Sequence, residues 1–293
     1  MKLSFLVALI VALVPTAAVA AEPTRAPGGR NFVGAQIDAS KDPYKQLNLL
    51  SMRVVDRGAG LNVWLLSSPK GCGGAWDVAV GKLAVDGQGR FQGQLVFGTP
   101  NAHPRGSATV EGQFVKTRDD VVVARTTFDA RFTGSPKCGT GTHRVRAISP
   151  RFGRPDGGRP APNALFVGTT QQSSSRIRVK LPMLALISRD GTQVKRFTTN
   201  TNVKCDSGRQ AGGIFRIKDI PIQGNSFDGV TGVQRPVQGT DQKRTLVLNA
   251  KGTFGQRSLV GTWRVHEVQT DPYSNVTDDC DTGNLKYVAA RVR

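Results

Sequence analysis

LAVDGQGRFQG, at Leu83–Gly93, is the segment that best indicates the fold of this 293-residue chain. It reads as an apolar strand, a tight turn at Asp86-Gly87 and a second strand that carries the motif Phe-x-Gly. IPIQGNSFDG, at Ile220–Gly229, has the same pattern with its own Gly-bearing turn. Two short strands joined by such a turn are typical of a β-hairpin. The same hairpin is therefore expected at two places in the chain.

Other motifs recur around this hairpin in the same order. Phe-Val-Gly precedes it, Gly-x-Phe follows it and Cys-x-Thr-Gly comes last, at Phe32–Gly34 and Phe166–Gly168, Gly112–Phe114 and Gly252–Phe254, and Cys138–Gly141 and Cys280–Gly283. Self-similarity that keeps its order marks two copies of one supersecondary unit. We therefore predict an internal duplication. The alternative is a single large β domain whose turns resemble one another because glycine is common in turns.

Between the motifs, apolar residues alternate with polar or small ones. This period of two predicts half-buried strands at Thr109–Phe114, Arg144–Ile148 and Arg176–Leu181. Turn signals occur at Asp86-Gly87, Asp190-Gly191, Gln223–Asn225 and Lys251-Gly252. We predict an all-β fold of two tandem antiparallel domains, each a β-sandwich or a β-barrel of six to eight strands. The alternating pattern does not distinguish a β-sandwich from a β-barrel.

Composition along the chain predicts the domain boundaries. Residues 1–20 carry one basic residue, an apolar run and an Ala-x-Ala ending, which is typical of a secretory signal peptide, with an uncleaved anchor as the alternative. Stretches rich in Pro, Gly and Arg predict a flexible N-terminus at 21–31 and a linker at 149–164, which leaves β domains at 32–148 and 165–293. No later stretch has the roughly 20 apolar residues of a membrane helix. We expect a secreted, periplasmic or cell-envelope protein without a membrane span.

The four cysteines, Cys72, Cys138, Cys205 and Cys280, fit this expectation because an even number in an exported chain favours disulfides. Their spacing is too wide for a Cys-x-x-Cys metal site, so metal ligation and thiol chemistry are the less favoured alternatives. Of the three possible connectivities, only Cys72–Cys138 with Cys205–Cys280 keeps each crosslink inside one copy. These bonds would close loops of about 66 and 75 residues and contribute roughly 4 kcal/mol each.

The end of each copy also resembles small all-β repeat modules of uncharacterised secreted bacterial proteins, which close with Cys-x-Thr-Gly and a strand that ends in Ala-Arg. The second copy carries the resemblance at Cys280, Thr282, Gly283, Ala290 and Arg291, together with Phe227-x-Gly229 and Gly252-x-Phe254. The first copy has Arg144–Ile148 in place of the Ala-Arg ending and so departs at the final position. The resemblance implies a fold type and no function.

Catalytic motifs do not stand out. His103, His143 and His266 are scattered, and no metalloprotease, nucleophile-elbow or phosphate-loop pattern occurs. The acidic run at Asp278–Asp281 could offer oxygen ligands to Ca²⁺, but its spacing is not that of an EF-hand, and a solvated acidic turn is favoured. We predict no catalytic residues, no cofactor and no metal site.

Six aromatic side chains could line a ligand platform, but core packing is the favoured role for them: Trp64, Trp76, Trp263, Phe91, Phe128 and Phe227. Trp76, close to two glycines and to Cys72, is the one that we most expect to be exposed.

Charge is the strong global signal, since 40 Lys and Arg against 21 Asp and Glu give a formal net charge of +19. Such a field attracts polyanions such as nucleic acid, acidic polysaccharide or an anionic envelope surface. Aromatic residues are only 6% of the chain, which is few for stacking on bases, so sequence-specific nucleic-acid binding is not expected. The alternative is that solvated arginines merely reflect composition. Candidate polyanion contacts are Arg144, Arg146, Arg176, Arg178 and Lys180.

Together these features predict a secreted, basic, non-enzymatic protein of two β domains that acts as a binding or envelope-associated module. Two other functions remain open. One is a secreted hydrolase whose residues meet only in three dimensions, for example around His266 or His143. The other is a carrier of apolar ligands, which would need a cavity inside a closed barrel.

Overall fold

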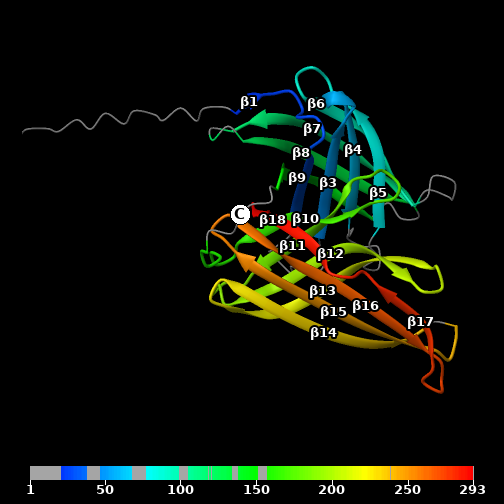
Figure 1. Ribbon diagram of the computed structural model, residues 1–293. Helices are drawn as coiled ribbons and strands as arrows, with labels where there is room; N and C mark the ends of the chain where they lie inside the picture. Colours follow the sequence, from blue (N-terminus) through cyan, green and yellow to red (C-terminus); the bar gives the residue numbers. More distant parts are fainter. Residues whose placement is uncertain are drawn as a thin grey trace, which may run out of the picture.

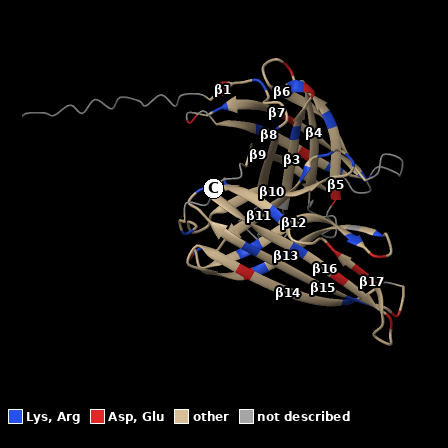
Figure 2. Ribbon diagram, in the orientation of Figure 1, with Lys and Arg blue, Asp and Glu red and all other residues tan. Residues whose placement is uncertain are grey.

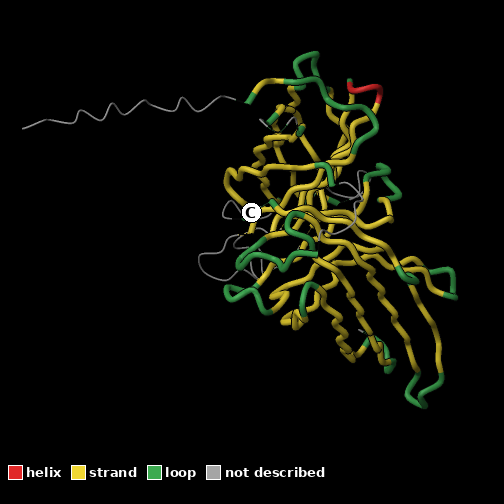
Figure 3. The backbone as a smooth tube through the Cα atoms, turned by 60° about the vertical axis from the view of Figure 1, so that its left-hand side comes forward, coloured by secondary structure: helices red, strands yellow, loops and turns green. Residues whose placement is uncertain are grey.

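The computed structural model describes residues 21–37, 47–67, 77–98, 105–117, 119, 121–133, 138–150, 157–237 and 239–292. These residues form two separate antiparallel sheets that lie one above the other (Figure 1). A single short 3₁₀ turn, η1 (Asp56–Gly58), is the only helical segment among them (Figure 3). The all-β prediction is therefore confirmed.

The first sheet closes into a barrel, here called barrel 1. Each strand pairs with the next in the chain, and the first also pairs with the last through Val33 and Ile148. Its strands are β2 (Asn31–Ile37), β3 (Leu47–Val55), β4 (Gly60–Ser67), β5 (Asp77–Ala84), β6 (Arg90–Phe97), β7 (Gly106–Lys116), β8 (Val122–Phe132) and β9 (Gly139–Ile148). This is an up-and-down barrel and not a sandwich.

The second sheet, barrel 2, has the same sequential strand order except that β18 follows β16 and β17 lies outside the ring. Its strands are β10 (Leu165–Ser173), β11 (Lys180–Ile187), β12 (Gln193–Cys205), β13 (Gln210–Gln223), β14 (Ser226–Pro236), β15 (Lys243–Phe254), β16 (Ser258–Thr270), β17 (Val276–Asp281) and β18 (Leu285–Arg291). Strand β18 pairs with both β16 and β10, and β11 pairs with β12, so the ring closes. Strand β17 bridges the far ends of β16 and β12.

Residues 21–30, from the stretch 21–31 for which a flexible N-terminus was expected, lie along barrel 1. Strand β1 (Glu22–Pro23) pairs with the end of β7, and Ala26 is buried in the core of the barrel. Of the expected linker 149–164, residues 157–164 likewise belong to barrel 2. Ala164 is buried in its core, and the carbonyl of Ala164 accepts the backbone N–H of Ile187 at 2.9 Å. Residues 151–156 lie outside the described residues.

Aromatic side chains fill the described interior of both barrels because alternate residues of each strand point inward. In barrel 1 these rings are Phe32, Phe91, Phe97, Phe114 and Phe128, and in barrel 2 they are Phe166, Phe197, Phe227, Phe254, Trp263 and Tyr287. The core role expected for Phe91, Phe128, Phe227 and Trp263 is confirmed. Trp64 is buried between the barrels, and Trp76 lies outside the described residues.

The repeated Phe-x-Gly and Gly-x-Phe motifs meet across strands. Phe91 pairs with Gly112 in barrel 1, and Phe227 pairs with Gly252 in barrel 2. A Cβ atom on Gly112 would come within 2.5 Å of the Phe91 ring, so the glycine makes room for the ring that covers it. Lys251-Gly252 was expected to form a turn, which is wrong: both residues lie inside β15, because Gly252 is needed under the Phe227 ring.

Cys-x-Thr-Gly has the same backbone role in both barrels. The hydroxyl of Thr140 accepts the N–H of Ala130 at 2.9 Å, and the hydroxyl of Thr282 accepts the N–H of Val265 at 2.9 Å. The following glycines, Gly141 and Gly283, have φ of 69° and 61°, which favours glycine. In each barrel the threonine hydroxyl thus serves as the acceptor for a strand N–H, at the start of β9 in barrel 1 and just before β18 in barrel 2.

The predicted disulfide Cys205–Cys280 is present and joins β12 to β17 across 75 residues. Cys138 is also disulfide-bonded. Cys72, its predicted partner, lies outside the described residues.

The outer faces of β2, β3 and β4 pack against those of β10 and β11. Ten buried apolar residues form this interface: Val33, Leu49, Trp64, Leu66, Leu165, Val167, Ile177, Val179, Leu184 and Leu186. The same motif contributes from both sides, since Val33 and Val167 are the central residues of the two Phe-Val-Gly segments. That the two barrels arose by duplication stays a prediction.

Removing the hydroxyl groups of Thr140 and Thr282 tests the role of Cys-x-Thr-Gly. We expect Thr140→Val and Thr282→Val each to lower the free energy of unfolding by about 1 kcal/mol, since a strand N–H loses its acceptor without a change in side-chain shape. Urea unfolding measures the effect. Thr262→Val is the matched control, because its hydroxyl makes no hydrogen bond to another described residue. Equal stability of all three variants would contradict the role.

Filling the space under Phe91 tests the aromatic-glycine contact. Gly112→Ala places a methyl group 2.5 Å from both the ring and the carbonyl oxygen of Arg125, so we expect a loss of about 1–3 kcal/mol. In Gly87→Ala the new methyl group meets nothing within 4 Å, and the thermal midpoint should not fall. If both variants have the same thermal midpoint, the contact between Gly112 and the Phe91 ring does not contribute to stability.

Candidate anion-binding groove

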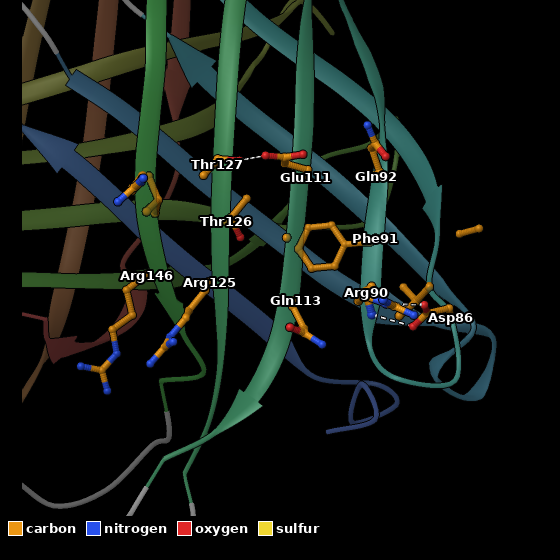
Figure 4. Close-up of a pocket in the computed structure, with 15 residues that line it drawn as sticks. Asp86, Arg90, Phe91, Gln92, Glu111, Gln113, Arg125, Thr126, Thr127 and Arg146 are labelled. Carbon is orange, nitrogen blue, oxygen red and sulfur yellow. Dashed lines mark hydrogen bonds and ion pairs between the residues drawn. The ribbon is translucent and has the colours of Figure 1, made fainter. Parts of the chain in front are cut away.

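A groove of about 1060 Å³ crosses the outer face of β6, β7, β8 and β9 (Figure 4). Its floor is one cross-strand row, Phe91, Gly112, Thr126 and Val145, which are direct partners on neighbouring strands. Phe91 and Val145 point into the core of barrel 1, so the floor of the groove is formed mainly by the backbone of this row.

Side chains of the two flanking rows point outward and form the walls of the groove. One wall is Arg90, Gln113, Arg125 and Arg146, and the other is Gln92, Glu111, Thr127 and Arg144. Four arginines and two carboxylates, those of Asp86 and Glu111, therefore line the groove.

Asp86 holds the arginine at the β6 end. Its Oδ2 lies 2.9 Å from Nε of Arg90, and its Oδ1 accepts the backbone N–H groups of Gln88 and Arg90. The backbone N–H of Arg90 is the main reason that the pKa of Asp86 is lowered. Asp86 therefore stays ionised, and its negative charge compensates the positive charge of Arg90.

Glu111 is positioned by a hydroxyl and not by a cation. Oγ1 of Thr127 donates to its Oε1 at 2.8 Å, and among the described residues no ion pair involves this carboxylate (Figure 4). Its second oxygen remains available to a ligand.

Arg125, Arg144 and Arg146, here called the arginine cluster, lie at the β8–β9 end of the groove. All three are exposed, and no ion pair joins them to a carboxylate of the described residues. Arg125 and Arg146 are direct cross-strand partners and extend side by side (Figure 4). Opposed Cβ atoms lie about 4.5–5.5 Å apart, so two like charges here destabilise the sheet. A bound anion would relieve this repulsion.

Barrel 2 has valines at two of the three corresponding positions. If Gly112 is matched to Gly252, the pairing register places Val260 and Val288 where barrel 1 has Arg125 and Arg146, and Lys286 where it has Arg144. Several basic residues of barrel 2 are joined to acids: Lys195 to Asp219, Lys251 to Asp228, Arg264 to Asp281, and Arg209 to both Glu267 and Asp278. Figure 2 shows the two signs interspersed on its strands. Barrel 2 also has two arginines opposed across strands, Arg235 and Arg244, but Arg244 is paired with Glu267 at 3.7 Å, whereas neither Arg125 nor Arg146 has a carboxylate partner among the described residues.

Two of the five predicted polyanion contacts, Arg144 and Arg146, lie in this groove. Arg125 was missed, because only the pairing of β8 with β9 brings it beside Arg146. Its position in the alternating pattern of residues 122–132 was the one signal that the sequence offered.

Arg176–Leu181 was predicted to be a strand with three basic residues on one face, and this is wrong. Residues 174–179 form the turn between β10 and β11, and only Lys180 and Leu181 are in a strand. Ile177 and Val179 are buried between the barrels, and the carbonyl of Ile177 accepts the side-chain amide of Asn62 at 2.8 Å. Burial against barrel 1 overrides the local alternation.

The three basic side chains of this segment consequently do not form a row. Nη1 of Arg176 donates to the carbonyl of Gly98 at 3.1 Å, and Nζ of Lys180 donates to that of Gln171. Arg178 has a φ of 53°, and its carbonyl accepts Nη1 of Arg53 at 3.1 Å. The hydrogen bonds of Arg176 and Arg178 hold this turn of barrel 2 against barrel 1.

The acidic run at Asp278–Asp281 is a strand, β17, and not a solvated turn. Pairing with β16 and β12 holds it extended, and each carboxylate has its own partner. Asp278 accepts from Ser207 and Arg209, Asp279 from His266 at 2.8 Å, and Asp281 from Arg264. Since strand alternation also splits the acids between two faces, they do not converge on one cation.

One potential metal-binding group among the described residues combines Cys205, Cys280 and Asp278. The two sulfur atoms are bonded to each other, so neither is a thiolate ligand. His143 lies against the ring of Phe128 with centroids 5.4 Å apart, and His103 is outside the described residues.

Comparison with family models, with curated proteins and with solved structures found no match to this chain. Among the described residues no helix is long and apolar enough to cross a membrane.

The repulsion in the arginine cluster can be measured without a ligand. Arg125→Gln should raise the free energy of unfolding by a few tenths to about 1 kcal/mol at low salt, and the gain should shrink as salt screens the charges. Urea unfolding at two salt concentrations measures it. Lys251→Gln, which removes the partner of Asp228, should not stabilise the protein. A loss of stability in Arg125→Gln would show that Arg125 has a structural role.

Proposed function

We propose that this chain is an exported, non-enzymatic protein that binds an anionic polymer in the groove of barrel 1. The observation that carries the proposal is the arginine cluster. Three exposed guanidinium groups lie on two neighbouring strands without a matching carboxylate among the described residues, although two of them repel each other across the strands. Arginine is the cation best suited to carboxylate, sulfate and phosphate groups, because its planar fork donates two hydrogen bonds at once.

The shape of the groove favours a chain over a single small anion. It crosses four strands, a distance of roughly 14 Å at the usual strand spacing, and polar side chains line both of its walls. A polymer could contact the arginine cluster with one unit and the amides of Gln92 and Gln113 with others. Each weak contact would then add to the next.

The other two candidate functions have less support in the described residues. Both barrel interiors are packed with aromatic side chains, which leaves an apolar ligand little room. His266 faces Asp279 on the outer side of β16, away from the groove of barrel 1, and so lacks the enclosed setting of a hydrolase site. Export is supported by the N-terminal pattern of residues 1–20 and by a disulfide that spans 75 residues.

Replacing the arginine cluster tests the proposal. In Arg125→Gln/Arg144→Gln/Arg146→Gln we expect elution from a heparin column at distinctly lower salt. We also expect at least a tenfold weaker affinity for polyphosphate, with a salt dependence whose slope falls by about one unit for each phosphate-binding arginine that is replaced. Fluorescence titration at several salt concentrations measures this.

The matched control is Arg235→Gln/Lys243→Gln/Arg257→Gln, which removes the same charge from exposed positions of barrel 2. It should bind almost as tightly as the unmodified chain. If both triple variants lose affinity equally, the protein binds through its net charge alone and the groove is not a site.

A further inference from the structure

We infer that the polymer is an acidic polysaccharide, a chain of sugar units that carry carboxylate groups. This inference rests on the proposed function and deepens it by naming the ligand. Three features of the groove carry it: the separation of charge along its length, the orientation of Glu111, and the lack of an exposed ring among the residues that line it.

Charge is distributed unevenly along the groove. The arginine cluster lies at the β8–β9 end, whereas Gln92, Gln113 and the matched pair of Asp86 and Arg90 lie at the β6–β7 end. A polyphosphate or nucleic-acid backbone carries a charge at every unit and gains little from the uncharged end. A polysaccharide offers both an acid and several hydroxyl groups, so its units can satisfy both ends.

Glu111 distinguishes a hydroxyl-bearing ligand from a purely anionic one. It lies between Gln92 and Thr127, its direct cross-strand partners, in the middle of one wall. Thr127 orients the carboxylate by donating to one oxygen, which leaves the other as a hydrogen-bond acceptor. A sugar hydroxyl can donate to that oxygen, and such a charge-assisted bond is strong. Phosphate groups can only be repelled by it.

Nucleic acid also lacks a stacking surface in this groove. Phe91 is the single aromatic residue among those that line it, and only 3% of its surface is exposed, because it points into the core. Binding of single-stranded nucleic acid relies on bases stacked upon exposed rings. The groove therefore offers hydrogen-bonding groups where a nucleic-acid site would offer aromatic faces.

The test is Glu111→Gln in the full chain with its disulfides intact, titrated at constant ionic strength with three probes: polygalacturonate, polyphosphate and single-stranded DNA. We expect polygalacturonate to bind about three- to tenfold more weakly, since a neutral amide is a poorer acceptor than a carboxylate. Polyphosphate and DNA should bind about two- to threefold more tightly, since a repelling charge has gone. The opposite signs are the signature of hydroxyl recognition.

Asp241→Asn is the matched control, because it removes one exposed negative charge from barrel 2. It should strengthen the binding of all three probes slightly or leave it unchanged. Unfolding midpoints of both variants verify that the fold is retained, as expected for exposed side chains.

The outcomes separate the two claims. If Glu111→Gln strengthens polygalacturonate binding as much as polyphosphate binding, the protein recognises only the negative charge of its ligand. The inference of a polysaccharide ligand is then wrong, but the proposal that the groove binds an anionic polymer is not affected. A result in which DNA is the tightest probe, and the only one that the arginine triple variant weakens, would assign the groove to nucleic acid. If the triple variant weakens no probe, the proposed function itself fails.

Discussion

Pairing of the first strand with the last is the constraint on which both barrels depend. An eight-stranded meander that did not close would leave two rows of unpaired backbone groups at its edges. Closure needs close approach of these strands, and glycine provides it. A Cβ atom on Gly34 would lie 2.3 Å from a side-chain carbon of Val145, and one on Gly168 would lie 1.9 Å from the carbonyl oxygen of Val288. The Phe-Val-Gly segments occupy this position in each barrel.

The same segments also join the barrels to each other. In Phe32–Gly34 the phenylalanine fills the interior, the valine points outward into the interface, and the glycine permits closure. Because Val167 of the second segment is in the same interface, equivalent faces of the two barrels meet. Strands β2 to β4 are thereby covered, and the opposite side of barrel 1, β6 to β9, remains open to solvent. The position of the groove follows from this arrangement.

The distribution of charge has a different basis. Sequence positions 22–148 contain 17 basic and 10 acidic residues (17 − 10 = +7), and positions 149–293 contain 22 and 11 (22 − 11 = +11). The more basic half nevertheless pairs many of its cations with acids, as Lys251 with Asp228 shows. The less basic half carries the opposed arginines Arg125 and Arg146, neither of which has a carboxylate partner among the described residues. We therefore base the proposed anion site on local pairing and not on net charge, because exposed charges are screened within about 10 Å.

The sequence was enough to predict an all-β fold, most of the turns and the Cys205–Cys280 disulfide. Alternation and turn glycines act over a few residues, whereas an even number of cysteines in an exported chain favours disulfides between residues far apart. Arg144 and Arg146 could be chosen because they alternate along a single strand. Tertiary structure alone decided the rest. Strand register brought Arg125 beside Arg146, and burial between the barrels turned the apparent strand at 176–179 into a connecting turn. Both outcomes depend on contacts between residues far apart in the chain, which no local pattern records.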